Sequence, residues 1–298
     1  MNSTEAVDPR FINIDTWPPE DAVGAMLEGQ LSAVAAIKTE VPKIARASEA
    51  GAKRLLAGGR LIYVGAGTSG RIAVQDGVEL GPTFGWPADR LAFVIAGGMA
   101  ALAQGAEGAE DNVADARAQI AALDLKQNDI VIGVAASGRT PFAVAAVEAA
   151  CAAGALTIGI SNNRHTVLLD VAEHAILADT GAEIIAGSTR MKAGTAQKVI
   201  LNMLSTAMML QIGRVYRGLM VDMLISNDKL LGRAHQMVAS LTNCSETDAI
   251  KAVEAAGRDI KLAVLIAMGH SPADARDLLA DNDHNLRRAI EQVKARPL

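Results

Sequence analysis

The chain has 298 residues, half of them hydrophobic, which is enough for one large domain or two modest domains with buried cores. The formal net charge is -5, and basic and acidic residues are mixed along the chain, so no basic stripe matches a nucleic-acid backbone. Cys151 and Cys244 belong to no C-x-x-C motif or Cys/His cluster, which predicts reduced thiols in a cytoplasmic protein without a structural zinc site.

Neither export nor membrane insertion is predicted. The N-terminus carries acids and a proline where a signal peptide needs a basic start and an apolar run. The longest apolar stretch, from Val199, falls short of the ~20 residues that cross a bilayer and is interrupted by polar residues. We expect it to form a buried helix.

In chain order, an irregular leader precedes a helix expected from about Pro19 to Ala47. From Arg60, short apolar runs alternate with helical stretches. The runs predict strands at "LIYVGAG", "LAFVIAGG", "DIVIGVAASG", "ALTIGISN" and "AILAD", with helices starting near Gly70, Met99, Pro141 and Ser188. This alternation predicts an α/β fold with a parallel sheet covered on both faces.

After Asn227 the strands stop, and the rest of the chain is predicted to be helical. "TDAIKAVEAAGRDIKLAV" from Thr247 aligns with "ADARDLLADNDHNLRRAI" from Ala273, and each copy predicts a helix, a turn and a helix. No catalytic groups gather there, so we expect a scaffold or interface. The predicted domains are residues 1–50, 51–228 and 229–298.

The first glycine loop has the spacing G-x-G-x-x-G at Gly65, Gly67 and Gly70. A dinucleotide site would also need an acid about 20 residues later, at the end of the next strand, but that strand ends in glycines. Thr68 and Ser69 can instead donate hydrogen bonds to a phosphate monoester. The loop therefore favours a terminal phosphate over a nicotinamide or flavin cofactor.

A second loop of the same kind follows another apolar strand, with Ser137, Gly138, Arg139 and Thr140 before Pro141 at a helix start. Each loop alone is compatible with an ordinary helix cap. Because ligands in parallel sheets bind beyond the carboxyl ends of the strands, the pair favours one shared phosphate site.

With these two loops the chain resembles the sugar isomerase (SIS) fold family, whose members bind phosphosugars through a G-T-S loop and an S-G-x-T loop. Within that fold it resembles the N-acetylmuramic acid 6-phosphate etherase family through "YVGAGTSGR", "PTFG", "IAGG", "EGAED", "AASGRTPF" and "GSTRMKAGTAQKVILNMLSTAMM". The resemblance implies a doubly wound parallel sheet with an N-terminal helical segment and a small all-helical C-terminal domain.

The resemblance also implies an activity: cleavage of a D-lactyl ether by elimination and hydration, in recycling of cell-wall amino sugars, by a carbon-oxygen lyase without metal or cofactor. It implies a homodimer with shared active sites. The substrate-binding residues that it implies are Gly67, Thr68, Ser69, Ser137, Gly138, Arg139, Thr140, Glu183 and Ser188.

The same resemblance places the catalytic carboxylates at Glu79, as proton donor, and at Glu110, as its acid/base partner. Val78 and Leu80 stand where the family pattern has Ser and Cys, and apolar neighbours would favour a protonated carboxyl at Glu79. By spacing alone, both acids are also compatible with a solvated helix face. Glu107 lies three residues before Glu110 and is its rival.

Arg190 and Lys192 are candidates for offsetting the charge of an anionic substrate; the alternative is that they are ordinary surface charges. Two other functions stay open from the sequence. One is a phosphosugar-binding regulator related to the glucokinase regulatory proteins, which would bind without turnover. The other is an aldose-ketose isomerase, which would interconvert hexose phosphates.

Overall fold

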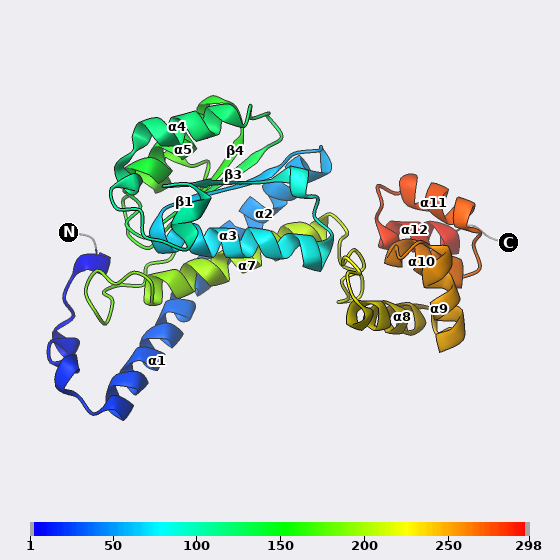
Figure 1. Cartoon of the computed structure of the whole chain (residues 1–298), viewed down its shortest axis with the longest axis horizontal. Coiled ribbons are helices and arrows are strands. Elements are labelled where there is room, and N and C mark those ends of the chain that lie inside the picture. Colours follow the sequence, from blue (N-terminus) through cyan, green and yellow to red (C-terminus); the bar gives the residue numbers. More distant parts are fainter. Residues whose placement is uncertain (1–2, 296–298) are drawn as a thin grey trace. The chain divides into compact units, whose positions relative to one another are not determined.

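The computed structural model describes residues 3–295 and divides into two compact units (Figure 1). The first comprises the residues up to Gly77 together with Asp89–Met208, and the second comprises Val78–Ala88 and the residues from Met209 onward. Helices α3 (Gly67–Phe84) and α7 (Lys192–Gln211) both pass from one unit into the other.

The first unit contains a sheet of five parallel strands in the order β2-β1-β3-β4-β5. Every residue of β1, β3 and β4 is buried, as expected for parallel strands covered on both faces. The five predicted apolar runs all form strands, which confirms the predicted sheet. Their bounds are β1 (Leu61–Gly65), β2 (Leu91–Ile95), β3 (Ile130–Ala135), β4 (Leu156–Ser161) and β5 (His174–Leu177).

Helices cover both faces of this sheet, with α4 and α5 on one side and α2, α3 and α7 on the other (Figure 1). On the first side, Ile62, Val64 and Val131 form one buried cluster with residues of α4 and α5. Gly133 allows the closest approach, since a Cβ there would lie 2.4 Å from Val147 Cγ2. The doubly wound fold is confirmed. The bounds are α2 (Val41–Leu56), α4 (Val113–Ala122), α5 (Pro141–Ala152) and α6 (Val167–Val171).

The helix predicted from Pro19 is interrupted. Helix α1 (Pro19–Ala35) passes through a 3-10 segment, Ala36–Glu40, into α2. Pro42 is the second residue of α2 and has no N–H to donate to the preceding turn, so a continuous α-helical ladder stops there.

Three other predicted helix starts were wrong, while the start at Pro141 is confirmed. Helix α3 begins at Gly67, earlier than expected, and α7 begins at Lys192, later than Ser188. Residues from Met99 form only a 3-10 turn, because the next α-helix begins at Val113 after Asn112 accepts a capping hydrogen bond from Asp115 N–H.

The second unit is helical and carries the predicted repeat. Ser245 caps α9 and Ser271 caps α11, and each hydroxyl also donates to an aspartate three residues on, Asp248 or Asp274. A helix, a turn and a helix thus occur twice in succession, first as α9 and α10 and then as α11 and α12. The helices are α8 (Asp228–Thr242), α9 (Glu246–Ala255), α10 (Ile260–Ala267), α11 (Pro272–Ala280) and α12 (Leu286–Ala295).

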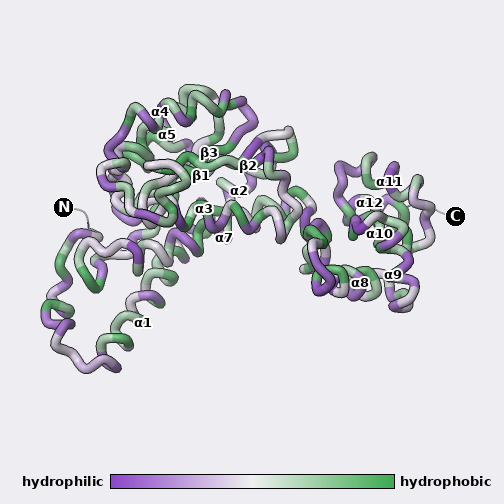
Figure 2. Tube along the Cα trace, in the orientation of Figure 1, coloured by the Kyte–Doolittle hydropathy of each residue, from purple (hydrophilic) through white to green (hydrophobic). Residues whose placement is uncertain are grey.

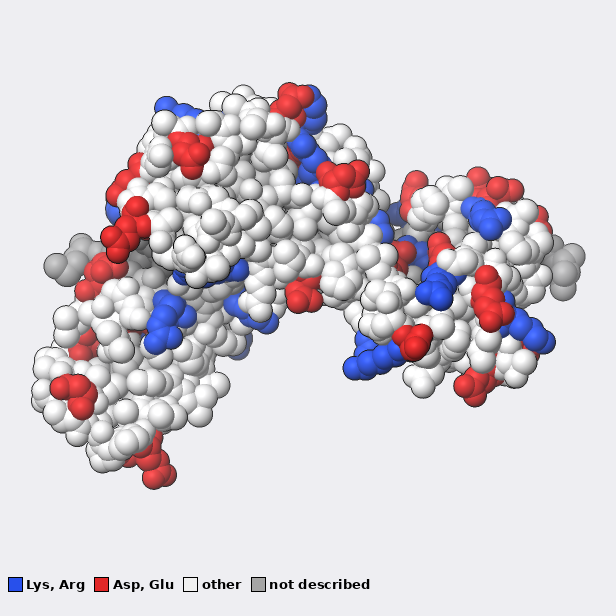
Figure 3. Space-filling model, viewed as in Figure 1, with Lys and Arg blue, Asp and Glu red and all other residues white. Residues whose placement is uncertain are grey.

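The apolar stretch from Val199 lies in α7, where Ile200, Leu201 and Leu204 are buried, as predicted. Over residues 3–295, no helix has both the length and the apolar character that crossing a membrane requires. On the face shown in Figure 3, acidic and basic side chains are interspersed.

Candidate phosphosugar site

The strand order brings the two hydroxyl-rich loops together. β1 pairs with β3 directly, so the loop after Gly65 and the loop after Ala135 leave the same edge of the sheet side by side. From this pair of strands the chain winds outward in both directions, to β2 on one side and to β4 and β5 on the other. A crevice at such a switch point is the usual ligand site of an open α/β sheet.

A cavity of about 370 Å³ opens at this switch point. Its lining comes from the two loops, from a 3-10 turn, from the segment before α7 and from the N-terminal segment. Most of the predicted binding residues and one predicted catalytic carboxylate lie there. These are Gly67, Thr68, Ser69, Ser137, Arg139, Thr140 and Glu110.

The first loop carries Thr68 and Ser69 in the first turn of α3, where backbone N–H groups lack partners within the helix. Gly65 and Gly70 let this helix start against the strand, because a Cβ on Gly65 would lie 2.8 Å from Gly70 Cα. Gly67 has a φ of +53°, a left-handed conformation that glycine adopts without strain. The loop thus presents two hydroxyls and a helix N-terminus to the cavity.

The second loop presents Ser137 and Thr140 at the start of α5. Thr140 is the N-cap residue of α5, yet its side chain makes no capping hydrogen bond. Its hydroxyl lies 3.4 Å from Ser137 Oγ, which also accepts a hydrogen bond from Arg139 N–H at 3.1 Å. An ordinary helix cap therefore does not account for Thr140, whose hydroxyl is available to a ligand.

Gly138 packs closely against Thr166 and Ser161 and does not line the cavity. It has a φ of +61°, and a Cβ there would lie 2.3 Å from Thr166 Oγ1. The Arg139 guanidinium donates to the carbonyl of His165 at 3.0 Å, which holds this cation at the edge of the loop.

Glu110 and Asp111 reach the cavity from the 3-10 turn Ala109–Asp111. Gly108, with a φ of +72°, redirects the chain just before this turn. The rival acid, Glu107, is not among the lining residues. Of the residue implied by the resemblance and its rival, only Glu110 therefore lines the cavity.

Glu79 does not line this cavity. It is an exposed residue of α3, about three helical turns after Gly67. Of the two neighbours expected to desolvate it, Leu80 is buried, but Val78 is 49% exposed. The apolar surroundings expected around Glu79 are therefore incomplete in the single chain.

Glu183 is fully buried and does not line the cavity. It caps the N-terminus of α7 instead. Its carboxylate accepts hydrogen bonds from the N–H groups of Lys192, at 3.0 Å, and Ala193, at 2.9 Å, at the start of α7. Burial lowers the pKa of Lys192, an effect that the nearby Glu183 opposes, and Lys192 Nζ donates to the Ala182 carbonyl at 2.8 Å. These contacts shape the segment that leads to α7.

Within that segment the cavity is lined by Thr189, while its predicted neighbour Ser188 lies outside the lining and Arg190 is exposed. Asp111 and Glu5 also line the cavity and were not predicted from the sequence. Asp111 could have been found beside Glu110, whereas no local signal marks Glu5. In the part of the chain described here, no cluster of His, Cys, Asp and Glu has the arrangement of a metal site.

Comparison with known proteins gives three kinds of match. Residues 42–151 match the family described as glucokinase regulatory protein N-terminal SIS domain. A protein of Streptomyces coelicolor named N-acetylmuramic acid 6-phosphate etherase is 45% identical over 97% of this chain and 93% of its own length. Proteins of the same name are 42% identical in Deinococcus radiodurans, over 98% of this chain and 96% of that protein, and 47% identical in Symbiobacterium thermophilum, over 88% and 87%.

Among solved structures, a Bacteroides fragilis protein described as a phosphosugar isomerase involved in capsule formation superposes with a TM-score of 0.52 at 20% identity. The match covers 67% of this chain and 95% of that one. At this identity the similarity shows a shared fold and nothing further.

Proposed function

Because the chain belongs to the N-acetylmuramic acid 6-phosphate etherase family, we propose that it converts N-acetylmuramic acid 6-phosphate and water into N-acetylglucosamine 6-phosphate and D-lactate. The observation that carries this proposal is the single cavity in which the hydroxyls of both loops lie with the carboxylate of Glu110. We place the reaction in the cytoplasm, in the recycling of cell-wall amino sugars.

The phosphate is proposed to bind between the two loops. Thr68, Ser69, Ser137 and Thr140 offer hydroxyl donors, and the N-termini of α3 and α5 add backbone N–H groups with a partial positive charge. Arg139 adds a full positive charge at the edge. Such an arrangement suits a terminal phosphate, whose oxygens accept many hydrogen bonds at once.

The proposed chemistry needs a base and an acid. In the open-chain sugar the C1 aldehyde acidifies the C2 proton, which a carboxylate removes while a carboxylic acid protonates the lactyl oxygen as the C3–O bond breaks. Water then adds at C3 and a proton returns to C2, which completes the exchange of lactate for hydroxyl. We assign Glu110 as the acid/base in the cavity and Glu79 as the proton donor to the leaving oxygen.

We propose that Glu79 reaches the cavity of a partner subunit in a homodimer. Two observations support this: Glu79 is exposed and does not line the cavity of its own chain, and helix α1 leaves an apolar stripe uncovered. The stripe is 43 to 63% exposed, and the hydrophobic segments of α1 are visible in Figure 2. It consists of Val23, Leu27, Leu31 and Val34.

The test is incubation of the full chain with N-acetylmuramic acid 6-phosphate and no added cofactor. D-lactate is measured enzymatically and the sugar product by mass spectrometry. Both are expected in equal amounts, and the unphosphorylated sugar is expected to react far more slowly because it has no group for the two loops. Folded protein that forms no D-lactate would overturn the proposal.

The match to the glucokinase regulatory protein SIS domain supports a second candidate, a phosphosugar-binding regulator. The matched residues, 42–151, include both hydroxyl loops, Glu79 and Glu110. The extent of this match therefore does not distinguish a regulator from an enzyme. Tight binding of N-acetylmuramic acid 6-phosphate without any product would favour the regulator.

A further inference from the structure

The N-terminal segment is built into the candidate site. Residues Ser3–Glu5 form a 3-10 turn in which Thr4 is fully buried. The Gly187 N–H donates to the Thr4 carbonyl at 2.9 Å, so the turn is tied to the segment that precedes α7. Figure 1 shows the same neighbourhood, with the blue N-terminal end beside the yellow-green loop before α7.

Asn163 anchors this turn to the second hydroxyl loop. Its side-chain amide donates to Thr4 Oγ1 at 2.9 Å and to the Ala136 carbonyl at 2.8 Å, and its carbonyl oxygen accepts from Ser3 Oγ at 2.9 Å. Asn163 is 2% exposed, and Ala136 directly precedes Ser137. One buried side chain therefore holds both the N-terminal turn and the loop proposed to bind phosphate.

Glu5 follows the buried Thr4 and lines the cavity. A Cβ on Gly187 would lie 2.9 Å from Glu5 Oε2, so the backbone of the neighbouring segment passes close to this carboxylate. Among residues 3–295, none forms an ion pair with Glu5. The contacts of Thr4 hold the backbone of the turn, and this backbone places the Glu5 carboxylate at the cavity. Its oxygens remain able to accept hydrogen bonds from a ligand.

A carboxylate at this position cannot bind an anion, because like charges repel, but it accepts hydrogen bonds from hydroxyl and amide groups. The hydroxyls proposed to bind the phosphate lie on the two loops, whereas Glu5 lines the cavity from the N-terminal turn. We propose that Glu5 accepts hydrogen bonds from the hydroxyl or acetamido N–H groups of the phosphosugar and selects for a sugar that carries them. This inference rests on the proposed phosphosugar site and adds a binding residue from the N-terminal segment.

The test compares Glu5→Ala and Glu5→Gln in the full chain with Glu20→Ala, which removes another exposed glutamate outside the cavity lining. Calorimetry measures the binding of N-acetylglucosamine 6-phosphate and, separately, of inorganic phosphate. Glu5→Ala is expected to weaken sugar-phosphate binding by about tenfold or more, as for loss of a hydrogen bond to a charged group. Glu5→Gln should restore part of the affinity, because its amide oxygen still accepts.

Inorganic phosphate is expected to bind all three variants at least as tightly as the parent, because removing the Glu5 charge removes a repulsion rather than an attraction. The inference is overturned if Glu5→Ala binds the sugar phosphate as the parent does, or if it loses inorganic phosphate to the same extent. Because these are binding measurements, they stand apart from turnover: a parent that binds sugar phosphate through Glu5 but releases no D-lactate would overturn the etherase proposal alone.

Discussion

Glu79 and Glu110 are both exposed acids, but only Glu110 lines the cavity. Glu110 lines the cavity from a short 3-10 turn, where Gly108 sets the direction of the chain. Glu79 belongs to the regular helix α3 and lines no part of that cavity. If both serve one reaction, only one of them is in position within a single chain.

Replacing Glu79 with Gln is expected to lower the rate of D-lactate release by about 10²- to 10⁴-fold, the usual contribution of a general acid. Binding of N-acetylglucosamine 6-phosphate should be unchanged, because the amide preserves shape and the phosphate donors lie elsewhere. Assays of D-lactate release measure the loss of rate, and calorimetry measures the binding of the sugar phosphate. Glu107→Gln is the matched control and should behave as the parent; a fully active Glu79→Gln variant would remove Glu79 from the mechanism.

The sequence allowed the position of both hydroxyl loops to be predicted, but not most of the other residues that line the cavity. Thr68, Ser69, Ser137 and Thr140 stand in short motifs that follow recognisable strands, so their chemistry and position were both readable. Glu183 was expected in the pocket but caps α7, because the burial that separates these roles arises from packing. Glu5 depends on Asn163, far along the chain, and no local pattern reports that contact.

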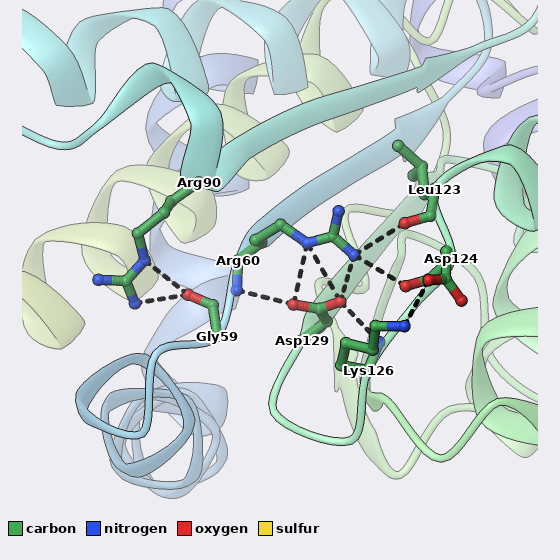
Figure 4. A network of polar contacts seen from close by, with 7 residues as sticks. All are labelled: Gly59, Arg60, Arg90, Leu123, Asp124, Lys126 and Asp129. Atoms are coloured by element: carbon green, nitrogen blue, oxygen red, sulfur yellow. Dashed lines mark hydrogen bonds and ion pairs between the residues drawn. The ribbon is translucent and has the colours of Figure 1, made fainter.

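Strands β1 and β3 are joined at their N-terminal ends by an ion pair (Figure 4). The cavity lies at the other ends of these strands, beyond Gly65 and Ala135. Arg60 directly precedes β1, Asp129 directly precedes β3, and Arg60 Nη2 lies 2.6 Å from Asp129 Oδ2. Asp129 also accepts from the backbone N–H groups of Arg60 and Lys126. These contacts hold in register the two strands from which both phosphate loops emerge.

The stability of this junction is expected to depend on pH. Burial disfavours the charged form of Asp129, but the hydrogen bonds from Arg60 and Lys126 outweigh it and hold the pKa below its ordinary value. Stabilisation by a carboxylate with a lowered pKa is present above the unfolded-state pKa, near 3.9, and is lost as pH falls through the folded-state value.

Accordingly, Asp129→Asn should lower the free energy of unfolding by about 1–3 kcal/mol at pH 7. The difference from the parent should shrink as the pH falls below about 4. Urea unfolding at pH 7 and at a pH below about 4 measures the free energy of unfolding of parent and variant. The control is Asp124→Asn, which changes an exposed acid of the same loop. A difference that is constant with pH would contradict the role of the ionised carboxylate.

Strand prediction succeeded at the scale of elements because buried parallel strands are continuous apolar runs. Helix starts were harder. Pro42 interrupts the N-terminal helix, and the starts of α3 and α7 depend on a close glycine contact and on the Glu183 carboxylate. The starts of α3 and α7 therefore depend on residues distant in the chain as well as on the local sequence.

We propose that two copies of the chain form a homodimer with shared active sites. The exposed stripe on α1 offers apolar area to a second copy, and Glu79 offers a carboxylate. In a twofold dimer any contribution of one chain to its partner is made twice, so both sites would be completed by the same exchange.

Mixing two inactive variants tests this arrangement. A heterodimer of Glu79→Gln and Glu110→Gln would contain one site with both carboxylates intact and one with neither. After subunits are exchanged, the mixture should recover about a quarter of the parent activity, since half of the dimers are mixed and half of their sites are complete. Sedimentation verifies the dimer, and a mixture that stays inactive would place both carboxylates on one chain.

The five strands, the helices of the C-terminal part and the two hydroxyl-rich loops could all be predicted from the sequence, because each is encoded by residues close together in the chain. Three placements became visible only in the folded chain: β1 lies beside β3, Glu110 rather than Glu107 lines the cavity, and Glu5 lines the same cavity. These placements depend on contacts between segments that are far apart in the chain. A hydrogen bond such as that between Asn163 and Thr4 forms only after the sheet has brought its partners together.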